Sequence, residues 1–329
     1  KRSGQHLDKS NLEQNYFIFD GITTIVERDS DDYRTVYKMN CQKGSGFITV
    51  YQAFPGIKLL YNGFDAVSCY CGKQSCDNIM EINYCLEGRL ECELQNGLYL
   101  YMGEGDFSGF MMNNHSITTG FPLKYYRGIS LELHLDEVEH ILPTIMKEMS
   151  IDIWALKDKL ICKNQYFIIR ARNEIEHIFS ELYSVPLSVQ KPYFKLKILE
   201  LLLFLSKIDV HKEDEQKLYY PKQQVEIIKK IQKQITEHPK RRYTIDELAK
   251  EHGISKTTLK TCFKGVYGTS IAAYMKKYRM EYAAVLLQQT RSSVADIAVK
   301  VGYENQSKFA AAFKEIVGIS PMQYRKINV

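Results

Sequence analysis

The sequence predicts a multidomain α+β protein: a β-rich N-terminal domain, a helical middle region and an all-α C-terminal domain. From residue 16 to about residue 135, short β-branched and aromatic runs alternate with glycine-containing turns. After Asp136 the apolar residues recur at helical spacing. Residues 222–329 carry 20 Lys and Arg against 9 Asp and Glu, a net charge of +11, whereas residues 1–221 have a net charge of −6. The C-terminal domain therefore suits a polyanionic partner, and the rest of the chain does not.

The β-rich segment, residues 1–135, is expected to form a small sandwich or barrel, because its strand-like runs are four to six residues long. Asn96-Gly97 is the preferred two-residue hairpin turn between two such runs. The spacing of Gly88, Asn96-Gly97 and Gly103-Glu-Gly-Asp106 resembles the cupin-type barrels that sense effectors. This resemblance implies a small-molecule effector in the N-terminal domain.

Metal-dependent catalysis in this segment is not expected. A metal-dependent cupin enzyme needs clustered histidine and carboxylate ligands, and only His115 and His134 lie near the right region. We therefore predict no catalytic residue, no metal site and no cofactor. The cysteines leave an alternative open: Cys69, Cys71 and Cys76 could sense a metal or an oxidant, or belong to an alkyl-DNA repair enzyme fused to a DNA-binding module. Their spacing matches neither paired Cys-X-X-Cys motifs nor a closed zinc site.

The middle region, residues 136–210, is predicted to be helical, and the polar residues 211–221 are predicted to be a linker. We expect a helix over 137–149 that is broken by Pro143, and a second helix over Phe167–Tyr183 with one apolar face. The next helix, Phe194–Ile208, is apolar nearly all round and must be covered on most sides. A second copy of the chain can cover it, which predicts a homodimer through Leu199, Leu202 and Leu203. The alternative is that the same chain covers the helix completely.

The C-terminal domain, residues 222–329, contains one pattern twice, about 50 residues apart. Thr244 with Glu247, and Ser293 with Asp296, are placed to cap the first helix of each copy. Gly253 and Gly302 are placed to end that helix in the left-handed conformation. A second helix follows in each copy, with an apolar pair turned inward: Leu259 and Phe263 in the first, Phe309 and Phe313 in the second.

The segment between the two copies, residues 270–287, has no Gly or Pro and has apolar residues at helical spacing. It is predicted to be one continuous helix that fixes the separation of the two copies. Two helix-turn-helix units held in this way would place both second helices in successive major-groove segments on one face of DNA, roughly 34 Å apart.

These residues resemble the AraC/XylS family of bacterial transcription regulators. The resemblance covers about residues 225–325 and rests on Ile-Ala-Val-Lys-Val-Gly-Tyr (297–303), Ala-Phe-Lys (312–314) and Gly-Ile-Ser-Pro-Met-Gln-Tyr-Arg (318–325). It implies binding to double-stranded promoter DNA and contact with RNA polymerase. With no membrane-spanning run and only eight cysteines in 329 residues, the chain is expected to be cytoplasmic.

The resemblance also implies which residues face the DNA. They lie on the second helix of each unit: Lys256, Thr257, Lys260, Thr261, Lys264, Gln306, Ser307, Lys308, Ala310 and Ala311. The family often has arginine at the positions of Thr261 and Ala311, and arginine is the side chain best shaped to read guanine. Recognition is therefore expected to depend on thymine methyl contacts, on Lys260 and Gln306, and on contacts to the DNA backbone.

Overall fold

The computed structural model describes residues 23–70, 78–94, 96–112, 118–141, 143–161, 167–170, 173–208 and 219–328. The chain divides into two compact units, residues 1–219 and residues 220–329. The helices of the middle region belong to the first unit together with the β-rich segment, so they do not form a separate region. The second unit begins two residues before the expected start of the C-terminal domain.

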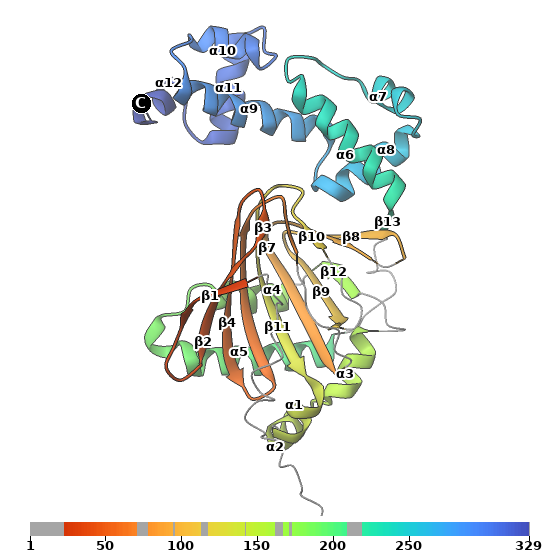
Figure 1. The fold of residues 1–329 in the computed structure, drawn as a ribbon, viewed down its shortest axis with the longest axis vertical. Helices are drawn as coiled ribbons and strands as arrows, with labels where there is room; N and C mark the ends of the chain where they lie inside the picture. The colour runs from red at the N-terminus through yellow and green to blue at the C-terminus, as the bar shows by residue number, and fades with distance from the viewer. Residues whose placement is uncertain are drawn as a thin grey trace, which may run out of the picture. The chain divides into compact units, whose positions relative to one another are not determined.

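The first unit is built on a curled antiparallel sheet (Figure 1). Its strands follow the order β1-β2-β4-β5-β11-β7-β10-β6-β3, with β8 and β9 also paired to β7 and β12 paired to β9. The strands are β1 (Thr23–Arg28), β2 (Arg34–Met39), β3 (Cys41–Gln42), β4 (Ser45–Phe54), β5 (Ile57–Asp65), β6 (Ser68–Tyr70), β7 (Ile79–Glu93), β8 (Leu98–Gly103), β9 (Asp106–Met111), β10 (Thr118–Gly120), β11 (Tyr126–His134) and β12 (Phe167–Arg170). A short strand, β13 (Tyr219–Pro221), lies at the boundary of the two units. The predicted β-rich N-terminal segment is confirmed.

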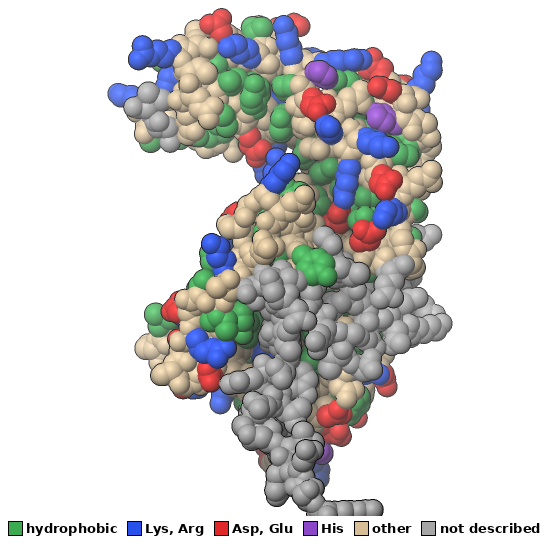
Figure 2. Space-filling view, viewed as in Figure 1, with side chains coloured by type: hydrophobic (Ala, Val, Ile, Leu, Met, Phe, Trp, Pro, Cys, Tyr) green, Lys and Arg blue, Asp and Glu red, His purple; other side chains and the backbone are tan. Residues whose placement is uncertain are grey.

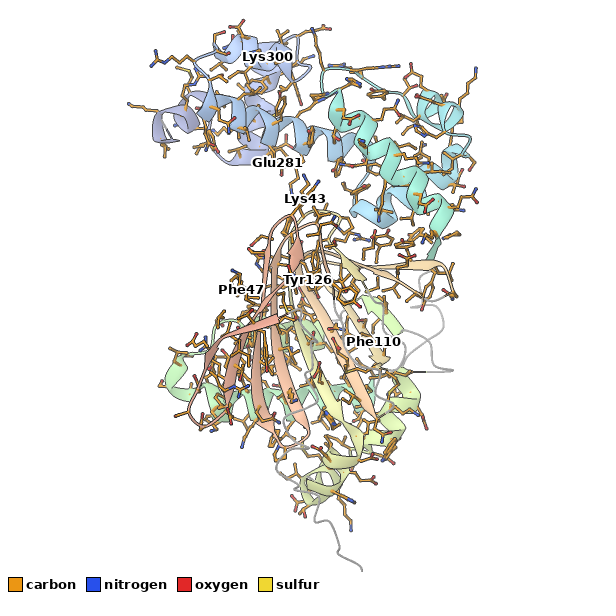
Figure 3. The ribbon with its side chains drawn as sticks, viewed as in Figure 1. Lys43, Phe47, Phe110, Tyr126, Glu281 and Lys300 are labelled. Atoms are coloured by element: carbon orange, nitrogen blue, oxygen red, sulfur yellow. The ribbon has the colours of Figure 1, made fainter. Side chains whose placement is uncertain are left out.

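Alternation along β11 separates the two faces of the sheet. Ile129, Leu131 and Leu133 are fully buried in a core that the sheet shares with the helices. Ser130 and Glu132 point to the opposite face, as the period of two requires. A second apolar core lies on that face nearer the other end of the strands and includes Tyr126 (Figure 3). The Tyr126 ring is stacked on Phe121, with 5.9 Å between the ring centroids. Both faces of the sheet are thus covered over much of its area.

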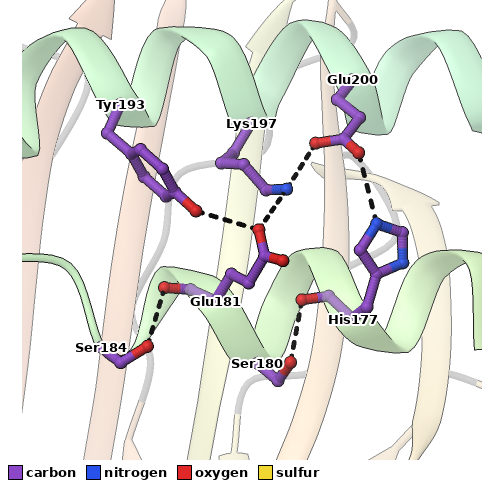
Figure 4. Close-up of polar contacts among 7 residues, drawn as sticks. All are labelled: His177, Ser180, Glu181, Ser184, Tyr193, Lys197 and Glu200. Carbon is purple, nitrogen blue, oxygen red and sulfur yellow. Dashed lines mark hydrogen bonds and ion pairs between the residues drawn. The ribbon is translucent and has the colours of Figure 1, made fainter.

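Helices cover the first of these faces, and α4 and α5 run side by side across it (Figure 4). The helices of this unit are α1 (Leu135–Ile141), α2 (Pro143–Glu148), α3 (Ile153–Leu160), α4 (Asn173–Leu182) and α5 (Gln190–Lys207), with a 3-10 turn at Leu187–Val189. The break between α1 and α2 falls where Pro143 predicted it. No helix in the described part of the chain is both long and apolar enough to cross a membrane.

A polar cluster joins α4 to α5 (Figure 4). Lys197 is 7% exposed as a residue, and its ammonium lies 2.6 Å from a Glu181 carboxylate oxygen and 2.5 Å from a Glu200 carboxylate oxygen. Tyr193 donates a hydrogen bond to Glu181 at 2.9 Å, and His177 Nε2 lies 3.3 Å from Glu200. Because a nearly buried lysine needs paired carboxylates, this cluster holds the two helices in one register.

Two local predictions in this unit are wrong. The helix expected over Phe167–Tyr183 begins only at Asn173, because Phe167–Arg170 form strand β12 and pair with β9. The expected two-residue hairpin turn is also incorrect: the Leu94 amide donates to the Leu98 carbonyl at 2.8 Å, so three residues separate the bonded pair. Gly97 is left-handed at φ +74°, but Asn96 is not, and the type I′ turn that Asn-Gly favours needs both.

Beyond β13 at its start, the described elements of the second unit are all helices (Figure 1). They are α6 (Lys222–Glu237), α7 (Ile245–Glu251), α8 (Lys256–Tyr267), α9 (Ile271–Gln289), α10 (Val294–Lys300), α11 (Gln306–Val317) and α12 (Pro321–Asn328). The predicted continuous helix between the two repeats is α9, which is confirmed. The all-α C-terminal domain is confirmed as well, while α6 and α12 were not predicted.

Candidate DNA-binding surface

Each repeat begins with the predicted capping box. The Thr244 hydroxyl accepts a hydrogen bond from the Glu247 amide at 3.1 Å, and the Glu247 carboxylate accepts one from the Thr244 amide at 2.8 Å. Ser293 and Asp296 make the same exchange at the start of α10. The hydrogen bonds from Thr244 lower the pKa of Glu247, and those from Ser293 lower the pKa of Asp296. Both first helices therefore start where the sequence predicted.

Each first helix ends in the same glycine turn. Gly253 and Gly302 have φ values of +63° and +85°, which a glycine adopts without a steric penalty. The amide of the residue after each glycine donates a hydrogen bond to a carbonyl of the helix. The Ile254 amide donates to the Ala249 carbonyl at 3.1 Å, and the Tyr303 amide donates to the Ala298 carbonyl at 2.9 Å. This is the Schellman arrangement, and it turns the chain toward the second helix.

The second helices, α8 and α11, match residue for residue. Each has twelve residues, each is capped by a side chain before it (Ser255 and Asn305), and each ends at a left-handed glycine (Gly268 and Gly318). A residue in α8 therefore corresponds to the residue 50 positions later in α11. In the first helices, α7 and α10, corresponding residues are 49 positions apart. The second repeat therefore has one additional residue, which lies in the turn before α11.

The inward faces of α8 and α11 form the cores of the two helix-turn-helix units. Leu259 and Phe263 are fully buried in α8, as are Phe309 and Phe313 in α11, and these predicted core positions are confirmed. The Phe313 ring also packs edge-on against Tyr324 of α12 at 5.6 Å. Cys262 belongs to the α8 core, and its burial raises the pKa of its thiol to about 12.

The outward face of α8 carries all the residues predicted to face DNA in the first helix-turn-helix unit. Lys256, Thr257, Lys260, Thr261 and Lys264 are all exposed. Their numbering places them within less than half a helical turn of one another, opposite the buried stripe. The Lys256 ammonium lies 3.0 Å from a carboxylate oxygen of Asp246, which is itself exposed. Exposed ion pairs are weak, so this lysine can exchange its partner for a phosphate.

The outward face of α11 carries the residues predicted to face DNA in the second helix-turn-helix unit. Gln306, Ser307, Lys308 and Ala311 are exposed, and Ala310 is half-buried. The match to α8 adds one residue that sequence reasoning left out of the surface: Lys314 is exposed at the position of Lys264. The repeat alignment could have identified it, because both lysines follow the inward phenylalanine.

Helix α9 connects the two helix-turn-helix units and is bonded to the segment before α7. Arg279 Nε donates to the Pro239 carbonyl at 2.8 Å, and its Nη2 donates to the Arg241 carbonyl at 3.1 Å. The Tyr278 hydroxyl donates to the Thr236 carbonyl at 3.1 Å. These hydrogen bonds fix α9 against the end of α6 and the loop before α7, and so against the first helix-turn-helix unit.

Basic and acidic side chains alternate over the visible face of this second unit (Figure 2). Two exposed examples are Glu281 on α9 and Lys300 on α10 (Figure 3). The net charge of +11 is therefore spread over several elements, and the outward face of α8 has lysines at 256, 260 and 264.

The comparisons with known proteins concern this unit. A family model described as a helix-turn-helix domain matches residues 248–327. A Streptomyces lividans protein described as an AraC-like transcription regulator is 36% identical over 88 residues, which is 27% of this chain and 29% of that protein. The C-terminal unit belongs to the AraC/XylS family.

Two other relatives also match less than a third of the chain. The transcriptional activator AarP of Providencia stuartii is 37% identical over 84 residues, 26% of this chain and 62% of AarP. The solved C-terminal domain of AraT, a response regulator from Geobacillus stearothermophilus, shares 34% identity over 31% of this chain and 84% of that domain, with a TM-score of 0.30. The chain spans under a third of the Streptomyces protein, so the similarity concerns one domain of that relative.

The remaining predicted residues lie in the first unit. Cys69 is 1% exposed, whereas Cys71 and Cys76 fall outside the described residues. Across the described ranges, no three His, Cys, Asp or Glu residues gather closely enough to hold a metal ion. His134 is buried, and this burial lowers its pKa to about 4. His115 also lies outside the described residues.

Proposed function

We propose that the protein is a transcription regulator that recognises promoter DNA through α8 and α11. The observation that carries this proposal is the residue-for-residue match of these two helices, each with an apolar face inward and a polar face outward, held apart by one continuous helix. A recognition helix needs this division, because its inner face anchors it while the outer face enters the major groove. The family of the C-terminal unit supports the same function.

The exposed side chains suggest how bases are read. Gln306 can bond adenine at two atoms, and Lys260 can bond guanine. Thr261 and Ala311 offer methyl groups to thymine where many relatives have arginine. Lys264 and Lys314, further along their helices, are suited to phosphate contacts that carry no sequence information.

We expect the full chain to bind DNA from upstream of its own gene in a gel-shift or anisotropy assay. With about 6 to 10 phosphate contacts, affinity should fall by about 10³ to 10⁵ between 50 and 200 mM salt, because neutralised phosphates release counterions. Gln306→Ala should weaken binding to the specific fragment alone, and Lys264→Ala should weaken specific and random duplexes alike. Absence of binding to either duplex at low salt would disprove the proposal.

We also propose that a polar small molecule binds the first unit, on the sheet face that carries Ser130, as in a cupin-like sensing domain. Polar side chains from neighbouring strands meet on this face. Asn62 Nδ2 donates to the Ser130 hydroxyl at 2.7 Å, and this hydroxyl donates to Asn83 Oδ1. Glu81 and Glu132 are buried cross-strand partners in the adjacent row. A few convergent polar groups beside apolar ones are the usual way a pocket orients a ligand.

Mass spectrometry of extracts from freshly purified, denatured protein tests this effector proposal. We expect a small molecule in stoichiometric yield from the native sequence and a reduced yield from Ser130→Ala, which removes the hydroxyl and adds no bulk. If neither extract contains one and no polar metabolite in a thermal-shift screen raises the melting temperature, the effector proposal fails.

We further propose that the protein is a homodimer through the outward face of α5. Leu196, Leu199 and Leu203 follow one another at intervals of three and four, so they share a face. That face lies opposite the buried stripe, and Leu196 is 64% exposed while Leu199 and Leu203 are half-buried. A two-fold pairing of this apolar stripe is the simplest closed arrangement. Leu202, by contrast, is fully buried in its own chain.

A further inference from the structure

A short basic loop, residues 240–242, lies between α6 and α7 and has no role in the surface described above. Lys240, Arg241 and Arg242 are consecutive and all exposed. The Arg241 guanidinium lies over the Tyr243 ring at 4.6 Å from its centroid. Within the described residues, no carboxylate oxygen lies within 4.0 Å of a charged nitrogen of these three side chains, unlike Lys256 and Lys276. Their charges are therefore available to a partner.

The backbone of the basic loop is held firmly. Arg279 on α9 donates to the carbonyls of Pro239 and Arg241, on either side of Lys240, at 2.8 and 3.1 Å. One guanidinium thus fixes two successive points of the loop, which its planar fork of donors allows. A loop fixed in this way presents its side chains with little loss of backbone entropy on binding.

The basic loop also touches the second helix-turn-helix unit. A Cβ on Gly302 would lie 3.0 Å from the Lys240 carbonyl oxygen and 3.2 Å from the Pro239 carbonyl oxygen. Gly302 is in the turn that leads into α11, and the loop itself leads into Thr244, the cap of α7. The loop that leaves α6 passes beside the α10 end of the unit in Figure 1. The three basic residues therefore lie where the two helix-turn-helix units meet.

We infer that the basic loop binds the sugar-phosphate backbone of DNA between the two segments that α8 and α11 read. This inference rests on the proposed DNA-binding function. Two recognition helices in successive major-groove segments leave one minor groove between them, bordered by a phosphate chain on each side. In the inferred complex, the exposed basic side chains between the two helix-turn-helix units would face these phosphates. Such contacts fix the position of the protein on the duplex without reading its sequence.

Arg279 is the positioning residue in this arrangement. Two of its five N–H donors are bonded to the carbonyls of Pro239 and Arg241. These two bonds set where Arg241 and Arg242 lie. The same bonds tie the loop to α9, so the loop keeps its place relative to both recognition helices.

The test uses the full chain carrying Arg241→Ala and Arg242→Ala together. Binding is measured by anisotropy on the upstream fragment and on a random duplex of equal length, over a range of salt concentrations. We expect affinity to fall by a similar factor on both duplexes, and the slope of log K against log salt to become shallower by about 1.8, the value for two lost phosphate contacts. The matched control is Lys230→Ala with Lys233→Ala, which removes the same charge from exposed positions of α6 and should leave the slope unchanged.

Arg279→Lys tests the positioning role, because it keeps the charge but cannot donate to both carbonyls in the same geometry. We expect a shallower salt slope with both loop arginines present, and no further change when it is added to the double variant. If Arg279→Lys lowers the melting temperature without changing the slope, its role is structural alone.

Two outcomes separate the inference from the function on which it rests. If the native chain binds the upstream fragment and the loop variant binds it with the same slope, the basic loop is not a phosphate contact and the proposed function stands. If the native chain binds neither duplex, both fail. A loss of affinity confined to the specific fragment would also overturn the inference, because phosphate contacts do not distinguish sequences.

Discussion

Phe313→Ala is expected to destabilise the second unit by about 3–5 kcal/mol, the usual cost of removing a fully buried aromatic ring. The Phe313 ring is inaccessible to solvent and packs between Phe309, at 5.8 Å, and Tyr324, at 5.6 Å. Because both neighbours are large rings on different elements, the cavity left behind cannot collapse easily. The loss should therefore fall near the upper part of this range.

The single tryptophan makes this measurement possible in the intact chain. Trp154 lies on α3 in the first unit, so its fluorescence reports on that unit alone, while far-UV ellipticity includes the helices of the second. In a urea titration, Phe313→Ala should move part of the ellipticity change to lower urea and leave the fluorescence transition in place. Val299→Ala, at a 49% exposed position of α10, is the control. An unchanged ellipticity curve for Phe313→Ala would show that the ring is not core.

Replacing Leu196 and Leu199 together with glutamate is expected to convert the protein from dimer to monomer. Four glutamates would then meet across a two-fold axis in place of apolar side chains, and like charges at a buried contact are strongly unfavourable. Light scattering at micromolar concentration measures the change as a halving of the molecular mass. A monomeric mass for the native chain would end the dimer proposal directly.

Leu202→Ala provides the matched contrast on the same helix. Its side chain is fully buried in the chain's own core, so the substitution should lower the stability of the first unit by about 2–5 kcal/mol. The Trp154 transition should shift to lower urea while the mass stays that of the native protein. If Leu202→Ala instead produced a stable monomer, the assignment of the two faces of α5 would be reversed.

The second unit could be predicted closely because its signals are local. Thr244 and Glu247 are three residues apart, Gly253 ends the helix that they start, and each decision depends on a few neighbouring residues. Helix α6 was within reach of the same reasoning: Val225, Ile228 and Ile235 are at helical spacing and are all buried. The sequence alone therefore contains the pattern that predicts this helix.

The first unit was harder to predict, because its elements depend on distant partners. The short apolar run Phe167-Ile-Ile-Arg is compatible with a strand or with the start of a helix. Its pairing with β9 decides that it is a strand. Nothing near residue 167 in the sequence specifies that partner. The meeting of Asn62, Asn83 and Ser130 likewise depends on strand register, which composition alone does not reveal.

The continuity of α9 ties distance to rotation. Its 19 residues span about 28 Å, and every residue advances the chain by about 1.5 Å while turning it by about 100°. One residue gained or lost in this helix would therefore barely change the distance between the two helix-turn-helix units. It would, however, rotate the second helix-turn-helix unit away from the face of the DNA that the first one contacts. The length of α9 is therefore constrained by the rotation between the two recognition helices. An insertion that a flexible linker would tolerate would here turn α11 away from its major-groove segment.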